Sequence, residues 1–286
     1  MNALYFARQS LLALCLTVVT TGVFAQAPPA TQEYEPQSGQ EGKDVVWVPT
    51  AQALVDKMLD MAKVTPDDYV IDLGSGDGRL VITAAKRGAR ALGIEYNPDL
   101  VELSKRNAAK EGVGDKAQFV KADLFESDFS EATVITMFLL PDLNLKLRPT
   151  ILDLKPGTRI VSNTFTMEEW AADETAEVRG DCTNYCTALL WIVPAKVEGA
   201  WQLPRGTLTL KQNFQKISGS LKSGNKTTRI TNGRLRGDQI SFAAGGARYA
   251  GRVSGDAIEG TVKSGRNNSK WTATRASKPA AGGSGS

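Results

Sequence analysis

Residues 72–79 read Asp72-Leu73-Gly74-Ser75-Gly76-Asp77-Gly78-Arg79, and this stretch decides the fold. It closes a short apolar run, Tyr69–Leu73, that is typical of a buried strand, and it leads into Gly78–Arg87, which has helical periodicity. Glycines at such a junction let the backbone approach a ligand that a Cβ atom would exclude. The spacing D-x-G-x-G-x-G is shifted from the dinucleotide pattern G-x-G-x-x-G, but its context is that of a nucleotide-binding turn.

The alternation of strands and helices continues on both sides of this turn. It predicts an α/β fold with a mostly parallel sheet and helices on both faces. The expected helices are Thr50–Val64, Gly78–Arg87, Pro98–Lys110 and Leu145–Leu154, with a helical turn at Trp170–Asp173. The expected strands are Tyr69–Leu73, Ala91–Tyr96, Gln118–Ala122, Thr133–Leu140, Arg159–Ser162, Thr175–Arg179 and Ala188–Val193.

The pattern changes after Pro194. Gly206–Arg275 has no helical period and consists of short alternating runs separated by Gly-Asp, Gly-Asn and Gly-Gly pairs. The segment Gly233–Ile240 recurs as Gly251–Ile258, and each copy is typical of a strand, a tight turn and a second strand. We therefore expect a C-terminal antiparallel β meander of about six to eight strands, closed as a small barrel or packed as a sandwich.

The N-terminus has the organisation of an export signal. Arg8 precedes an apolar run from Leu11 to Phe24, and Val23-Phe24-Ala25 has the small-residue spacing of a signal-peptidase site. The run is shorter than the roughly 20 residues of a bilayer span, although an uncleaved membrane anchor is an alternative. Either reading places the protein outside the cytoplasm, in the periplasm or attached to the outer side of a membrane.

These patterns divide the chain into five regions. We expect a signal peptide at residues 1–25, a linker rich in Pro, Gln and Glu at 26–44, and the α/β domain at 45–198. A basic β module follows at 199–276, and 277–286 is expected to be a disordered tail.

Three carboxylates close three successive expected strands. Asp72 ends the first, Glu95 lies about 20 residues further on, and Asp123 follows the third. Because parallel strands end at the same edge of a sheet, the three are expected to meet in one crevice. Glu95 could bridge two ribose hydroxyl groups there, and Asp123 could accept a hydrogen bond from the exocyclic amine of adenine. The alternative for Glu95 and Asp123 is a solvated carboxylate at a strand end.

The sequence resembles the class I S-adenosylmethionine-dependent methyltransferases over about residues 45–198. VIDLGSGDGR (70–79) matches their first motif, and IEYN (94–97) and KADLF (121–125) match the acidic second and third. The resemblance is closer to bacterial methyltransferase-domain proteins and to the mitochondrial protein-lysine methyltransferases. These share a VPT segment (48–50) and a Leu-Pro pair like Leu140-Pro141.

The resemblance implies a Rossmann-like catalytic domain that uses S-adenosylmethionine as its cofactor. It implies that Asp72 and the turn of Gly74, Ser75 and Gly76 hold the methionine end, and that Glu95 binds the ribose. It also implies that Asp123 and Leu124 contact the adenine, and that Thr50 touches the cofactor from the leading segment.

The acceptor is expected at Leu139–Asn144, where class I enzymes place acceptor-binding groups. Asp142 could accept an ammonium proton and Asn144 could orient an amine, although both could instead cap the helix that follows. The segment lacks the N/D-P-P-Y/F motif of amino-group DNA methyltransferases, which counts against a nucleic-acid substrate. We therefore expect a protein side chain as acceptor, with lysine favoured.

Histidine is absent from the chain. This excludes histidine triads, a histidine general base and nearly all common zinc or iron sites, so no metal is expected. Cys182 and Cys186 flank three residues between two expected strands. They could form a disulfide in an oxidising compartment or remain buried thiols.

Charge is divided unequally along the chain. Residues 201–286 contain 15 Lys and Arg against 3 Asp and Glu, whereas residues 1–200 contain 19 against 28. Such a module could bind an anionic envelope component, dock on its own acidic domain, or carry a solvated basic surface. A second hypothesis is therefore an exported, non-catalytic binding protein in which both parts recognise an anionic envelope component.

Overall fold

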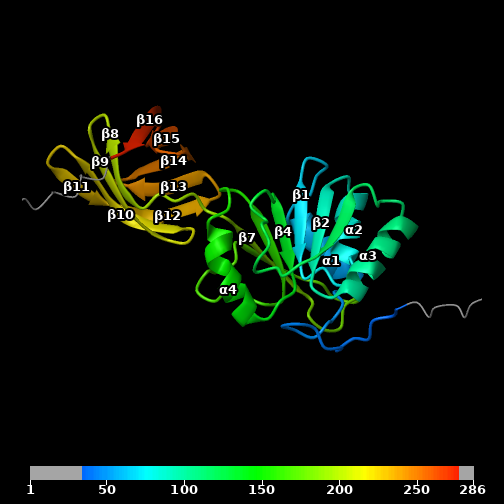
Figure 1. Cartoon of the computed structure of the whole chain (residues 1–286). Coiled ribbons are helices and arrows are strands. Elements are labelled where there is room, and N and C mark those ends of the chain that lie inside the picture. The colour runs from blue at the N-terminus through cyan, green and yellow to red at the C-terminus, as the bar shows by residue number, and fades with distance from the viewer. Residues whose placement is uncertain (1–33, 277–286) are drawn as a thin grey trace, which may run out of the picture. The chain divides into compact units, whose positions relative to one another are not determined.

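The computed structural model describes residues 34–276, which form two β-sheets with four helices around the first (Figure 1). The expected signal peptide, the first part of the linker and the expected tail at 277–286 lie outside this range. The helices are α1 (Gln52–Met61), α2 (Arg79–Lys86), α3 (Pro98–Lys110) and α4 (Pro141–Leu152). The strands of the first sheet are β1 (Tyr69–Leu73), β2 (Arg90–Glu95), β3 (Ala117–Lys121), β4 (Val134–Met137), β5 (Arg159–Asn163), β6 (Glu174–Glu177) and β7 (Thr187–Ile192).

The first sheet has the strand order β3-β2-β1-β4-β5-β7-β6. Strands β1 to β5 are parallel, β7 is antiparallel to β5, and β6 is antiparallel to β7. Successive side chains of β1 face opposite sides of the sheet. Val70 packs in the core under α1, α2 and α3, and Ile71 packs in the core under α4. The expected α/β fold is confirmed, with the strand order reversing between β1 and β4.

Several expected elements differ from the structure, and α1 spans Gln52–Met61 rather than Thr50–Val64. Strand β4 ends at Met137 rather than Leu140, and α4 begins at Pro141 rather than Leu145. The cause is Pro141, because proline suits the first helical position and keeps the preceding residue extended. The expected helical turn at Trp170–Asp173 is absent. Trp170 is buried in the core instead, and its carbonyl oxygen accepts a hydrogen bond of 2.6 Å from Nε1 of Trp191.

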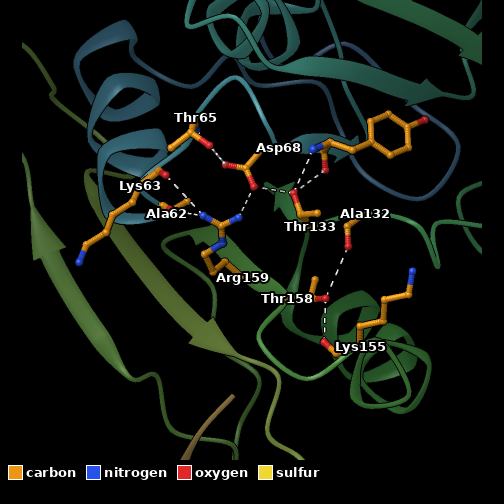
Figure 2. Close-up of polar contacts among 10 residues, drawn as sticks. Ala62, Lys63, Thr65, Asp68, Ala132, Thr133, Lys155, Thr158 and Arg159 are labelled. Carbon is orange, nitrogen blue, oxygen red and sulfur yellow. Dashed lines mark hydrogen bonds and ion pairs between the residues drawn. The ribbon is translucent and has the colours of Figure 1, made fainter. Parts of the chain in front are cut away.

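A polar network joins the amino ends of β1, β4 and β5 (Figure 2). The Arg159 guanidinium forms an ion pair with Asp68 and donates a 2.7 Å hydrogen bond to the carbonyl oxygen of Ala62. Asp68 also accepts from the backbone N–H of Thr65 at 2.8 Å and from Oγ1 of Thr133 at 2.7 Å. Burial acts to raise the pKa of Asp68, but the hydrogen bonds from Thr133, Thr65 and Arg159 outweigh it and lower that pKa.

The second sheet closes into a barrel. Its strands are β8 (Gly199–Leu203), β9 (Gly206–Asn213), β10 (Lys216–Ser223), β11 (Lys226–Arg229), β12 (Thr231–Arg236), β13 (Gln239–Ala244), β14 (Ala247–Ser254), β15 (Ala257–Ser264) and β16 (Asn267–Arg275). Pairing between β9 and β10 completes the ring, so the module is a barrel rather than a sandwich. Gly206–Arg275 contains eight of these strands, β9 to β16, as expected, and β8 precedes them. The short β11 pairs with β10 alone. The repeated segments form the hairpin turns at Gly237 and Gly255.

Ion pairs and stacking connect the two sheets. Arg234 lies 2.7 Å from Asp173, and Arg236 lies 2.5 Å from Glu174. The ring of Phe214 stacks on Trp170 with centroids 5.8 Å apart. Part of the basic charge of the β module is thus used in contacts with the acidic α/β part. This agrees with the expected alternative in which the module docks on its own acidic domain.

Candidate active site

The main cavity of the α/β part lies at the carboxyl ends of β1, β2 and β4, beside the point where the strand order reverses. Open α/β sheets bind their ligands at such points. Its volume is about 110 Å³. The structure brings all the expected cofactor residues to its lining, from three strand ends and the segment before α1: Thr50, Asp72, Gly74, Ser75, Gly76, Glu95, Asp123 and Leu124.

The glycine turn after β1 takes a conformation that favours glycine. Gly74, Gly76 and Gly78 have φ values of +80°, +54° and +82°. A Cβ atom at Gly76 would lie 2.6 Å from Nε1 of Trp47, which also lines the cavity. A Cβ atom at Gly78 would lie 2.8 Å from the ring of Phe119. Gly76 therefore allows a close approach at the cavity, and Gly78 allows α2 to pack close to the sheet.

Asp72 is the buried carboxylate of the site. It is 2% exposed, and its Oδ1 accepts a hydrogen bond of 2.7 Å from Oγ1 of Thr136. Burial, together with the negative charges of Glu95 and Asp77, raises the pKa of Asp72 to about 7, against the lowering effect of the hydrogen bond from Thr136. A positively charged ligand group beside Asp72 would favour the ionised form, so the residue is suited to bind a cation.

The Glu95 carboxylate connects the second strand to the glycine turn. Its Oε2 accepts from the backbone N–H of Gly76 at 2.9 Å, and its Oε1 accepts from the N–H of Asn97 at 2.8 Å. These bonds fix the orientation of the carboxylate. Next to it, Oγ of Ser75 is buried and has no hydrogen-bond partner among residues 34–276.

The segment before α1 covers the cavity, which the sequence did not reveal. Residues 40–44 fall in the expected linker, yet they line the cavity together with residues 45–50. The backbone N–H of Trp47 donates to the carbonyl oxygen of Gln40 at 2.9 Å, so the segment folds back on itself. Lys43 forms an ion pair with Asp123, which raises the pKa of Lys43 and lowers that of Asp123. Polar composition alone gave no signal for this contact.

An aromatic cluster borders the main cavity. The rings of Phe138, Phe165 and Tyr185 have centroids 5.2 to 5.9 Å apart. They line a second cavity of about 80 Å³, whose lining includes Val45, Val46, Val48 and Phe138 of the main cavity as well as Leu140. Tyr185 is 44% exposed and lies inside a loop closed by a disulfide between Cys182 and Cys186. Of the two states considered for these cysteines, the structure has the disulfide.

The two expected catalytic residues line neither cavity. Because α4 begins at Pro141, Asp142 lies exposed in its first turn and Asn144 faces the core. Nδ2 of Asn144 donates to the carbonyl oxygens of Phe165 at 3.3 Å and Thr166 at 3.1 Å. The capping alternative is wrong, since the N-cap is Leu140 and has no side-chain bond. Asn144 positions the segment that carries Phe165, and a direct catalytic role for Asp142 or Asn144 stays a prediction.

The chain is similar to known methyltransferases. Residues 72–174 match the model of the ANTKMT methyltransferase domain. A protein-lysine N-methyltransferase of Saccharolobus islandicus is 44% identical over 152 residues, which cover 52% of this chain and 94% of that protein. The adenine nucleotide translocase lysine N-methyltransferase of Mus musculus is 32% identical over 128 residues, or 44% of this chain and 56% of that protein. This chain therefore spans about half the length of the mouse relative.

A solved structure is similar as well. The RNA methyltransferase from Salinibacter ruber, in complex with S-adenosyl-L-homocysteine, has 47% sequence identity and a TM-score of 0.49. The match covers 52% of this chain and 96% of that one.

Proposed function

Since the chain belongs to the protein-lysine N-methyltransferase family of class I S-adenosylmethionine-dependent methyltransferases, we propose that it methylates lysine side chains of a protein. The observation that carries this proposal is the meeting of Asp72, Glu95 and Asp123 at one cavity beside a left-handed glycine turn. None of the similar proteins described above supports the alternative of a non-catalytic binding protein.

The cavity residues fit S-adenosylmethionine, the cofactor of this family. Asp72 is a buried acceptor suited to a cationic group, and Glu95 and Asp123 are carboxylates suited to ribose hydroxyl groups and to the adenine amine. A Cβ atom at Gly76 would meet the Trp47 indole at the lining of the cavity, so the turn has no room for a side chain there. When bound, the cofactor supplies a methyl group on a positively charged sulfur atom.

The aromatic cluster suits the acceptor side chain. A lysine amine must lose its proton to act as a nucleophile, and at pH 7 this costs about 4.6 kcal/mol for a pKa near 10.4. Apolar surroundings lower the pKa of an amine because they disfavour its charged form. Val45, Val48, Phe138, Phe165 and Tyr185 provide such surroundings next to the cofactor residues. Asp142 stays the predicted acceptor of the proton, and alignment by the site supplies most of the remaining rate enhancement.

The test is to identify the methylated atom. The protein is incubated with S-adenosylmethionine labelled in its methyl group and with a protein extract, and the products are analysed by mass spectrometry. We expect methyl-lysine, which is stable to acid and mild base. Label in lipid, nucleic acid or base-labile carboxyl esters would contradict the lysine assignment and leave the methyltransferase assignment intact.

Asp142→Asn tests the proton acceptor. It should slow labelling by about 100-fold, the lower range for loss of a general base, while the affinity for S-adenosylhomocysteine stays the same. Asp153→Asn removes an exposed carboxylate just past the other end of α4 and serves as the matched control. Equal labelling rates in the two variants would remove Asp142 from the mechanism.

We also propose that the protein is exported. The organisation of residues 1–25 supports this, as does the disulfide between Cys182 and Cys186, since disulfides persist mainly in oxidising compartments. No helix within residues 34–276 is long and apolar enough to cross a membrane. N-terminal sequencing of the protein from the envelope fraction should begin at Gln26. Full-length protein found only in the cytoplasm would contradict export.

A further inference from the structure

The barrel contains a cavity that is separate from the methyltransferase site. Its volume is about 410 Å³, and none of its lining residues lines the main cavity. The cavity opens to solvent, and its volume lies within the range of about 300–1,000 Å³ that small-molecule sites have.

The cavity lies where the barrel wall is incomplete. Strand β16 pairs with β15 from Asn267 to Thr274, but on its other edge it pairs with β8 only at Thr274 and Arg275. Strand β8 ends at Leu203, so within residues 34–276 the first part of β16 has no strand on that side. The cavity is formed in this gap, next to the turn at Pro204 and Arg205.

One side of the cavity is apolar and rigid. Leu203, Leu221, Tyr249, Val262 and Trp271 line it. The ring of Trp271 is 6% exposed, and its Nε1 donates to the carbonyl oxygen of Ala250 at 3.0 Å. Tyr249 packs edge-on against Trp271 with ring centroids 5.5 Å apart. A ligand would find an aromatic surface already in place.

Positive charge surrounds the same cavity. Arg205, Lys222 and Lys270 line it, no acidic residue does, and none of the three forms an ion pair within residues 34–276. Further cations occupy the ends of the strands at this end of the barrel: Lys226, Arg248, Lys263 and Arg266.

The acidic residues of the module lie toward the opposite end of the barrel. Asp238 and Asp256 are in the turns at that end and are paired with Arg252 and Arg275. Glu259 follows the second of these turns, near the start of β15. The end with the cavity therefore carries positive charge that no residue of the module neutralises, which attracts anions.

We propose that this end of the barrel binds a small amphiphilic anion, a carboxylate or phosphate attached to a hydrocarbon chain or ring. The apolar part lies against Leu221 and Trp271, and the anionic group lies near Lys222 and Lys270. The large exposed hydrophobic residues of the described chain (Val46, Tyr96, Val120, Leu140 and Tyr185) all lie outside the barrel. The barrel thus offers no side chain for insertion into a bilayer, which favours a single ligand taken into the cavity.

The experiment uses the full chain and calorimetric titration with decanoate. We expect saturable binding of one decanoate per chain that weakens with salt. The double variant Lys222→Gln with Lys270→Gln should bind decanoate at least about tenfold more weakly. Lys216→Gln, a cation at the other end of β10 with no ion pair, is the matched control and should leave affinity unchanged. Val262→Phe, which fills the cavity, should also weaken binding.

Matched probes separate the parts of the ligand. Decanol lacks the charge, decyltrimethylammonium reverses it, and inorganic phosphate lacks the apolar part, so each should bind much more weakly than decanoate. Naphthoate replaces the hydrocarbon chain of decanoate by a ring. Whichever of the two anions binds more tightly indicates whether the natural ligand carries a chain or a ring. Saturating S-adenosylhomocysteine should leave decanoate binding unchanged.

Three results would overturn the proposal. They are absence of binding by both decanoate and naphthoate, equal affinity for decyltrimethylammonium, and affinity unchanged in the double variant and in Val262→Phe. If the protein co-sedimented with vesicles of phosphatidylglycerol and phosphatidylcholine but did not bind decanoate, the positive charge of the barrel would serve to bind a membrane surface instead.

Discussion

The ammonium group of Lys43 is paired with the carboxylate of Asp123, so a residue from the segment before α1 occupies the group expected to bind the adenine amine. The same ammonium lies 5.0 Å from the centre of the Tyr96 ring. Trp47 of this segment covers the turn at Gly76. These contacts make the segment a cover over the main cavity, and a ligand amine at Asp123 would compete with Lys43 for the same carboxylate.

The first prediction concerns this pair. Lys43→Ala should tighten the binding of S-adenosylhomocysteine, because Asp123 no longer has to leave an internal partner. The gain should be less than about tenfold, since exposed ion pairs contribute little. Lys86→Ala, which breaks an exposed pair with Glu111 away from the cavity, is the control for calorimetry. Weaker binding in Lys43→Ala would mean that Lys43 contacts the ligand instead.

The glycine turn provides a second prediction. Gly76→Val should abolish binding of S-adenosylhomocysteine, because a side chain there would lie where Trp47 and the ligand approach. Gly112→Val is the matched control, since Gly112 also has a positive φ, of +67°, but a Cβ atom there would meet nothing within 4 Å. Both variants should lose about 1–2 kcal/mol of stability from the left-handed backbone. Retained binding in Gly76→Val would remove the turn from the site.

Much of the α/β fold was predictable because the deciding signals are local. Strand β1 and helix α3 have the expected bounds, Tyr69–Leu73 and Pro98–Lys110, since apolar runs, the glycine turn and Pro98 all act within a few residues. The convergence of Asp72, Glu95 and Asp123 was also predictable, because parallel strands end at one edge of the sheet.

The parts that could not be predicted depend on contacts between distant residues. Lys43 and Asp123 are 80 residues apart in sequence, and no local pattern relates them. Asn144 was expected at the acceptor, but the early start of α4 at Pro141 turns it toward the carbonyl oxygens of Phe165 and Thr166. The gap in the barrel results from the unequal lengths of β8 and β16. The alternation of apolar and polar residues does not define these lengths.

The network at the amino ends of the strands should affect stability and not binding. Arg159→Met leaves Asp68 buried without its ion-pair partner and should cost about 2–4 kcal/mol of unfolding free energy. The affinity for S-adenosylhomocysteine should be unchanged, since the cavity lies at the carboxyl ends. Arg179→Met, which breaks an exposed pair with Glu177, should cost far less. Chemical denaturation and calorimetry separate the two effects, and loss of affinity in Arg159→Met would contradict this assignment.

Asp72 should make cofactor binding depend on pH. Its pKa near 7 means that below pH 7 its carboxyl group must lose a proton before it can pair with a cation. The affinity for S-adenosylhomocysteine should then fall by up to about tenfold for each pH unit below 7. In Asp72→Asn the affinity should be low and nearly constant between pH 5 and 7. A wild-type affinity that does not change over this range would show that the ligand does not pair with Asp72.

The same residue should lower the stability of the ligand-free protein. A carboxyl group whose pKa rises on folding, from about 3.9 to about 7, reduces stability progressively as pH rises between these values and by a constant amount above them. Asp72→Asn removes this cost and keeps an oxygen that can accept the hydrogen bond from Thr136. The variant should therefore raise the melting temperature, and more so at pH 8 than at pH 5. Equal shifts of the melting temperature at the two pH values, or a variant that melts earlier at pH 8, would mean that the ionised Asp72 carboxylate does not destabilise the ligand-free protein. The expected result would instead identify Asp72 as a residue kept for its ligand at the expense of stability.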